Sequence, residues 1–105
     1  LMPADPVNYV HKFASKLDLS PMTQTKALKL IDSIKKHGLN SGKSPKAIAA
    51  GAIYLAAILN GEKRTQEKVA LVSNVTEVTI RNRYKEFSEK LGLKEKILEK
   101  TNAAA

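Results

Sequence analysis

The segment Ala47-Ile-Ala-Ala-Gly-Ala-Ile-Tyr-Leu-Ala-Ala-Ile-Leu59 contains no charged residue and no proline. Ser44-Pro45 precedes it, which is a helix N-cap followed by the residue best suited to the first helical position. Apolar residues fall on nearly every side of this segment, and a helix that is apolar all round is buried all round. The sequence therefore predicts a central helix over 47–59. Its many Ala residues and Gly51 would let neighbouring helices approach closely.

Further helices are predicted on both sides of this segment. Asp5-Pro6 and Ser20-Pro21 are start signals followed by apolar residues three and four positions apart, which predicts helices over 5–17 and 21–37. The second of these helices has a predicted apolar stripe, formed by Ala27, Leu28, Ile31 and Ile34, and Gly38 closes it as a left-handed residue.

Two more helices follow the central one, and the first of them is short. Thr65 and Thr76 are N-caps that predict helices over 65–73 and 76–91. Gly92 ends the second of these, and residues 94–100 add one or two helical turns. No strand-like alternation persists anywhere in the chain. We therefore expect an all-α domain of five helices in which the hydrophobic third helix is the centre.

Composition limits the classes of function. The 105 residues include 18 Lys and Arg against 10 Asp and Glu, and the excess lies in segments 26–46 and 62–85. Such clustering predicts a polyanionic partner. The chain has no Cys, which excludes a disulfide scaffold, a thiolate zinc site and a Cys nucleophile. Its longest uncharged stretch, 47–61, is shorter than the roughly 20 residues that a membrane-spanning helix needs, so we expect no membrane partner.

A catalytic site is not predicted. His11 and His37 lie far apart on different predicted helices, and nothing pairs either with a nucleophile. The carboxylates mostly alternate with Lys, as on solvated helix surfaces. We expect no enzymatic activity, no metal and no cofactor.

The last two predicted helices have the spacing of a helix-turn-helix. Ala70 provides a small residue where the helices cross, Asn74 a turn residue four positions later, and Ile80 an apolar anchor six positions further on. The usual turn residue is Gly, but Asn tolerates the left-handed conformation better than most residues. The pattern predicts a helix-turn-helix over about 65–91.

The second helix of this unit has two different faces. Steps of about 100° per residue from Ile80 place Tyr84, Phe87 and Leu91 on the buried side. Val78, Arg81, Asn82 and Lys85 fall on the opposite side. Arg can bond guanine, Asn can pair with adenine, and an aliphatic side chain can contact the thymine methyl, so Val78, Arg81 and Asn82 are the predicted base contacts. The alternative is a solvated face of Arg81, Arg83 and Lys85, with Arg83 partly over the core.

The residues before the helix-turn-helix suit a phosphate. Glu62-Lys63-Arg64-Thr65-Gln66 offers two cations, a hydroxyl, an amide and unpaired backbone N–H groups at a helix start. Gly42-Lys43-Ser44-Pro45 offers the same chemistry more weakly, and Ser44 is better explained as an N-cap. The predicted contacts to the DNA backbone are Lys63, Arg64, Thr65, Gln66, Thr79, Arg83 and Lys85.

Four motifs in this order resemble one known family: Gly42-Lys43-Ser44-Pro45, Ala52-Ile53-Tyr54, Glu62-Lys63-Arg64-Thr65-Gln66 and Thr76-Glu77-Val78-Thr79-Ile80-Arg81. The family is that of general transcription factor B, which comprises the archaeal factor and its eukaryotic IIB-type relatives. The resemblance is to the second of its two cyclin-fold repeats, covers most of residues 5–92, and is more archaeal than eukaryotic in style.

The resemblance implies a five-helix cyclin repeat whose last two helices read the B recognition element upstream of the TATA box. It places Val78 and Arg81 at base-contacting positions, and Arg64, Thr65, Gln66 and Lys85 at or beside positions that approach the DNA backbone. In the family, the complete factor binds the complex of TATA-box-binding protein with promoter DNA and recruits RNA polymerase.

The zinc ribbon, linker and first repeat of the family are absent from this sequence. We therefore expect residues 1–105 to be a single, monomeric repeat from a larger factor. It would act in the archaeal cytoplasm at the nucleoid, or in the nucleus of a eukaryote. The alternative is a cyclin-like interaction scaffold whose lysine-rich segment, Lys26 to Lys36, binds an acidic protein.

Overall fold

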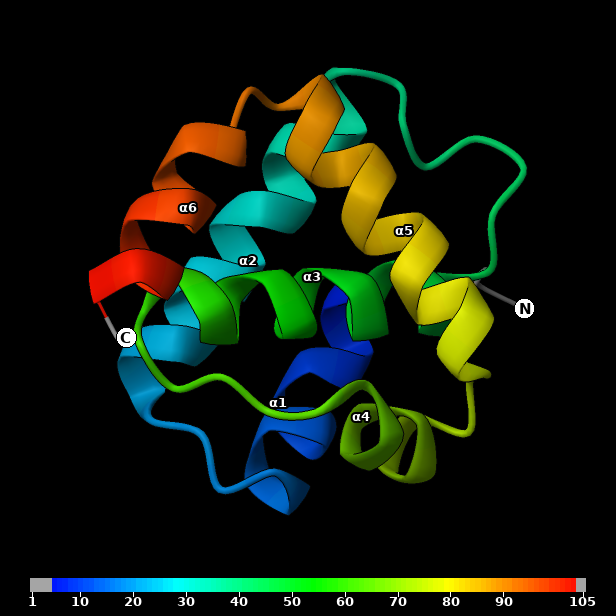
Figure 1. The fold of residues 1–105 in the computed structure, drawn as a ribbon. Helices are drawn as coiled ribbons and strands as arrows, with labels where there is room; N and C mark the ends of the chain where they lie inside the picture. The colour runs from blue at the N-terminus through cyan, green and yellow to red at the C-terminus, as the bar shows by residue number, and fades with distance from the viewer. Residues whose placement is uncertain (1–4, 104–105) are drawn as a thin grey trace.

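The computed structural model describes residues 5–103, so both ends of the predicted 1–105 domain lie outside the described residues. Within that range it has six α-helices and no strand, which confirms the all-α prediction (Figure 1). The helices are α1 (Val7–Lys16), α2 (Pro21–Lys36), α3 (Pro45–Leu59), α4 (Gln66–Ser73), α5 (Glu77–Lys90) and α6 (Lys94–Ala103). The sixth helix is longer than the one or two turns predicted after Gly92.

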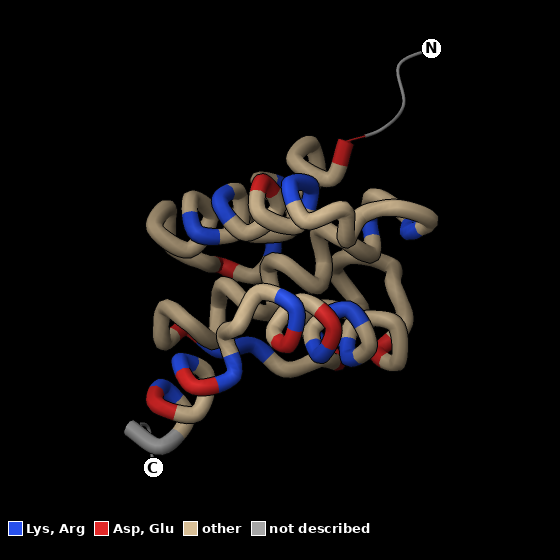
Figure 2. Tube along the Cα trace, turned by 90° about the horizontal axis from the view of Figure 1, so that it is seen from above, with Lys and Arg blue, Asp and Glu red and all other residues tan. Residues whose placement is uncertain are grey.

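Helix α3 is the centre of the fold, as its sequence predicted. Every residue from Ala47 to Leu59 is buried, and α3 contacts each of the other five helices. Helices α2 and α5 make the most extensive contacts with α3 and lie on opposite sides of it, which is clearest in the view from above (Figures 1 and 2). The fold therefore presents two outer faces on opposite sides of a central helix whose residues 47–59 are buried and uncharged.

Four of the helices begin at the predicted caps. The side-chain oxygens of Ser20, Ser44, Thr65 and Thr76 each accept a hydrogen bond from the backbone N–H three residues later. A cap of this kind contributes about 1 kcal/mol to the stability of a helix. Helix α1 differs slightly, because the Asp5 carboxylate accepts from the N–H of Val7 at 2.9 Å and the regular helix starts only there.

The left-handed positions are also confirmed. Gly38, Asn74 and Gly92 have φ angles of 68°, 57° and 67°, and each follows the last turn of a helix. At Asn74 the backbone N–H donates to the carbonyl of Ala70 at 2.9 Å. This geometry produces the sharp reversal between α4 and α5.

One part of the predicted core is wrong. Leu28 is 39% exposed, and Leu30, at 7%, takes its place in the buried stripe of α2. Both residues lie near the same apolar stripe on a helical projection. The direction from which α3 approaches decides between them, and that direction is a tertiary property.

No helix within residues 5–103 combines the length and the apolar character needed to cross a bilayer.

Candidate nucleic-acid interface

Helix α5 is held firmly against the core along one side. Ile80 and Phe87 are completely buried, and the Tyr84 ring meets the Tyr54 ring of α3 edge-on, with centroids 5.2 Å apart. Burial raises the pKa of the Tyr84 phenol. The predicted buried side of this helix is therefore the observed one.

The opposite side of α5 is open to solvent. Val78 is 54% exposed, and Arg81, Asn82 and Lys85 are exposed as well. Residues three and four apart are neighbours on a helix surface, so Val78 lies beside both Arg81 and Asn82 in the first two turns. The structure therefore brings the three predicted base contacts together on one accessible surface, the reading face (Val78, Arg81, Asn82).

The approach of α5 to α3 depends on the absence of a side chain at Gly51. A Cβ atom added there would lie 2.6 Å from the Cβ of Arg83 and 3.3 Å from Cε2 of Phe87. The first distance is shorter than van der Waals contact permits. Gly51 thus sets how closely α5, the helix that carries the reading face, packs against α3.

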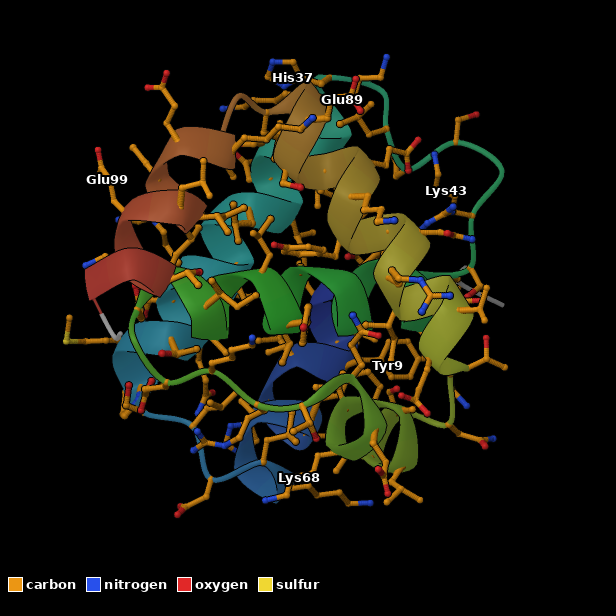
Figure 3. All side chains as sticks on the ribbon, in the orientation of Figure 1. Tyr9, His37, Lys43, Lys68, Glu89 and Glu99 are labelled. Carbon is orange, nitrogen blue, oxygen red and sulfur yellow. The ribbon has the colours of Figure 1, made fainter. Side chains whose placement is uncertain are left out.

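Arg83 lies at the edge of this contact. Its side chain is 22% exposed, and its Nε is 3.8 Å from Oε1 of Glu86. The other oxygen of Glu86 pairs with the Lys43 ammonium at 3.1 Å, and Lys43 also donates to the carbonyl of Leu39 (Figure 3). This cluster fixes the 37–44 segment against α5 and keeps Arg83 partly over the core, as the alternative interpretation expected.

Arg64 has a structural role that the sequence did not predict. Its Nε donates to the carbonyl of Leu17 at 2.9 Å, and its Nη2 donates to the carbonyl of Asp18 at 3.0 Å. Nη1 donates to the carbonyls of Glu62 and Lys63. The guanidinium therefore satisfies acceptors at the C-terminal end of α1, which lack partners within their own helix. A contact of Arg64 with phosphate stays a prediction.

Glu62 is the first residue of the segment that suits a phosphate, and its carboxylate faces the start of α2. It accepts hydrogen bonds from Thr23 Oγ1, from Ser20 Oγ at 2.8 Å and from the Ser20 N–H at 3.2 Å. The bond from Thr23 is the largest of the effects that lower the pKa of the Glu62 carboxyl, and the bonds from Ser20 add to it. The carboxylate also suits the positive end of the α2 dipole. No local pattern could reveal this link, because its partners lie about 40 residues away in the sequence.

The remaining predicted backbone contacts lie at helix starts. Lys63 is exposed, Thr65 caps α4 by accepting from the N–H of Lys68 at 3.1 Å, and Gln66 is half-buried in the first turn. Lys68, labelled in Figure 3, lies on the outer side of α4. At the start of α5, Thr76 donates to the Thr79 hydroxyl at 2.9 Å. Polar and positively charged side chains thus lie at the N-terminal ends of both helices of the unit.

Within the described part of the chain, no group of three or more His, Asp and Glu side chains is arranged to hold a metal ion. The two histidines make local contacts: His11 Nδ1 lies 3.2 Å from Gln24 Oε1, and His37 Nδ1 lies 2.8 Å from the carbonyl of Ser33.

Comparison with known families agrees with this geometry. The model of the family described as "Transcription factor TFIIB repeat" matches residues 2–90. The chain belongs to the TFIIB repeat family. The TFIIB repeat is a cyclin-like fold of transcription factors, which is not a class of enzymes, and the resemblance drawn from the four motifs is confirmed.

Similar proteins occur in archaea. The chain is 54% identical over 89 residues to transcription initiation factor IIB of Pyrococcus abyssi and 52% identical over 93 residues to that of Archaeoglobus fulgidus. It is 53% identical over 93 residues to transcription initiation factor IIB 1 of Thermoplasma volcanium. These alignments cover 85% to 89% of this TFIIB repeat but only 28% to 30% of the relatives. The chain therefore spans less than a third of their length.

Proposed function

We propose that this TFIIB repeat is a DNA-binding module of a general transcription initiation factor and that it reads the B recognition element upstream of the TATA box. The exposed Val78 carries the proposal. It is 54% exposed in the first turn of α5 and lies beside the exposed Arg81 and Asn82, so an aliphatic group and two hydrogen-bonding groups share one accessible surface. In the major groove, an aliphatic side chain at this position contacts a thymine methyl while Arg81 and Asn82 bond neighbouring bases.

The DNA backbone would be held on both sides of the reading face. The N-terminus of α4 presents unpaired N–H groups and the positive end of the helix dipole, which suits a phosphate. Lys85, one turn beyond Arg81, suits a phosphate farther along the groove. The proposed backbone contacts are Lys63, Arg64, Thr65, Gln66, Thr79, Arg83 and Lys85.

The partners of the longer factor are proposed from the family resemblance. Proteins named transcription initiation factor IIB are about three times longer than this chain. We propose that the chain is one monomeric repeat of such a factor. In that factor it would bind beside TATA-box-binding protein on promoter DNA, and the other parts of the factor would recruit RNA polymerase.

Fluorescence anisotropy tests the reading face. A labelled duplex carrying the upstream element and a TATA box is titrated with the chain, with and without archaeal TATA-box-binding protein. Arg81→Ala should cost about 1–3 kcal/mol and relax specificity at one base pair. The matched control is Lys96→Ala on the exposed side of α6, which removes the same charge and should leave the specificity unchanged.

Salt dependence and the protein partner give the decisive outcomes. With about four phosphate contacts, log affinity falls with log salt at a slope near −3.6. A slope near zero rejects DNA binding. A uniform loss over all sequences for Arg81→Ala makes Arg81 a backbone contact. Equal affinity with and without TATA-box-binding protein contradicts binding beside it.

A further inference from the structure

Helix α2 packs against α3 on the side opposite α5 (Figure 2). Exposed and half-buried side chains form a line along the surface of α2. Met22, Lys26, Lys29, Ser33 and Lys36 are spaced alternately four and three residues apart, and we call them the lysine seam. This spacing keeps side chains in one line along a helix, and it is the pattern along which a second helix packs. Met22, at 75% exposed, is the apolar end of the seam.

The seam has positive charge that the rest of the described chain does not neutralise. Lys36 pairs with Asp32 at 3.0 Å, and the neighbouring Lys35 pairs with Asp5 at 2.8 Å. Among residues 5–103, no carboxylate oxygen lies within 4.0 Å of the ammonium of Lys26 or Lys29. These two lysines lie in the middle of the seam, so an acidic partner would find its complement there.

A hollow lies on each side of these lysines. One is about 400 Å³ in volume and is bordered by Met22, Thr25 and Asn60. The other is about 250 Å³ and reaches His37, Leu91 and Leu93, where the end of α2 meets the segment between α5 and α6. Figure 3 shows His37 at that end of the molecule. Lys26 and Lys29 line both hollows. Apolar side chains of a partner could therefore enter on either side of these two lysines while its carboxylates pair with them.

We propose that the lysine seam is the docking site of an acidic amphipathic helix of another protein. The carboxylates of that helix would pair with Lys26 and Lys29, and its apolar side chains would enter the two hollows. An exposed Met and two half-buried Leu side chains beside the lysines favour a protein over a phosphate backbone, which has no apolar surface of this kind to offer.

The position of the lysine seam determines whether the chain can bind a protein and DNA at the same time. Because α3 separates α2 from α5, a helix docked on the seam leaves the reading face uncovered. The chain could therefore be bound to DNA and to an acidic protein at the same time. The proposal does not depend on the DNA sequence that α5 reads, and a variant of either surface can be tested against both ligands.

The probe is a fluorescein-labelled helical peptide with Glu on one face and Leu at alternating three- and four-residue spacing. Lys26→Glu/Lys29→Glu should lower the affinity of the chain for this peptide about ten-fold, since two attractive ion pairs become repulsive contacts. Lys12→Glu/Lys96→Glu changes the net charge equally at exposed sites on α1 and α6 and should leave the affinity unchanged. Met22→Ser should weaken binding without any change in charge.

A peptide of the same composition in scrambled order, and a duplex DNA, complete the test. Circular dichroism first establishes that both double variants are folded. Equal losses for the two double variants would mean that only net charge matters, and equal binding of the scrambled peptide would mean that no helix is recognised. Either result overturns the proposal. A loss of duplex affinity confined to Lys26→Glu/Lys29→Glu also overturns it, because the seam would then belong to DNA. Retained peptide binding by Arg81→Ala supports two independent surfaces.

Discussion

Replacing Gly51 by Ala should change the free energy of unfolding through two opposing effects, a gain in helix propensity and a loss from overpacking. In the middle of a helix, Ala is favoured over Gly by about 1 kcal/mol. The new methyl group, however, would lie 2.6 Å from the Cβ of Arg83, where carbon atoms need about 3.5–4.0 Å. A Cβ atom cannot rotate away, so α5 must move outward by about 1 Å. Overpacking of this kind costs about 1–3 kcal/mol.

The expected balance is a loss of up to about 2 kcal/mol in the free energy of unfolding, or several degrees in Tm for a domain of this size. Urea unfolding followed by circular dichroism measures it. The displaced reading helix should also weaken duplex binding under conditions in which the variant is fully folded.

Gly61→Ala is the matched control. A Cβ at Gly61 has nothing within 4 Å, but φ is +74°, so this variant carries backbone strain of about 1–2 kcal/mol and leaves α5 in place. It should lose stability and keep its affinity for DNA. A Gly51→Ala protein that is more stable than the parent and binds DNA equally well would refute the argument that Gly51 seats the reading helix.

Three further outcomes follow from the contacts described above. The pKa of Glu62 is lowered from 4.5, so the stability that its carboxylate contributes is complete above that pH and is lost as the pH falls through the folded-state pKa. Glu62→Gln should therefore reduce the difference between the urea midpoints at neutral and acid pH. An unchanged difference would contradict a stabilising role of the Glu62 carboxylate. Arg64→Lys should lower the free energy of unfolding in urea by about 1–3 kcal/mol, because an ammonium lacks the planar, forked donors with which Arg64 reaches the carbonyls of both Leu17 and Asp18. A variant as stable as the parent would argue against this role of Arg64. Lys85→Ala should weaken binding to all duplexes alike and reduce the salt slope by about 1, whereas a loss at one base pair only would make Lys85 a base contact.

Local features of the sequence predicted most of the fold because they act over a few residues. A Ser or Thr cap satisfies an N–H three positions later, and Asn74 needs only its own backbone to adopt the left-handed conformation. The exposure of Val78 followed from helical geometry alone once Ile80 was taken as the anchor. These predictions needed no knowledge of how the helices pack.

The features that were missed all join distant parts of the chain. Glu62 binds residues near position 20, Arg64 binds the end of α1, and Gly51 meets Arg83. In the sequence, both Glu62 and Arg64 stand in the segment that suits a phosphate, and a guanidinium can bond a phosphate as well as backbone carbonyls. The choice between Leu28 and Leu30 likewise depended on where α3 lies. Which partner a polar or apolar group takes at long range is decided by the assembled core.

The burial of residues 47–59 in α3 has a consequence when the chain is not folded. When the chain unfolds, Ala47 to Leu59 becomes an uncharged apolar run without a proline, the kind of segment that associates with copies of itself. Lys43 and Lys46 on one side, and Lys63 and Arg64 on the other, bracket this run with like charges that oppose such association. The charged residues that oppose aggregation thus flank the apolar run and place no charge within it.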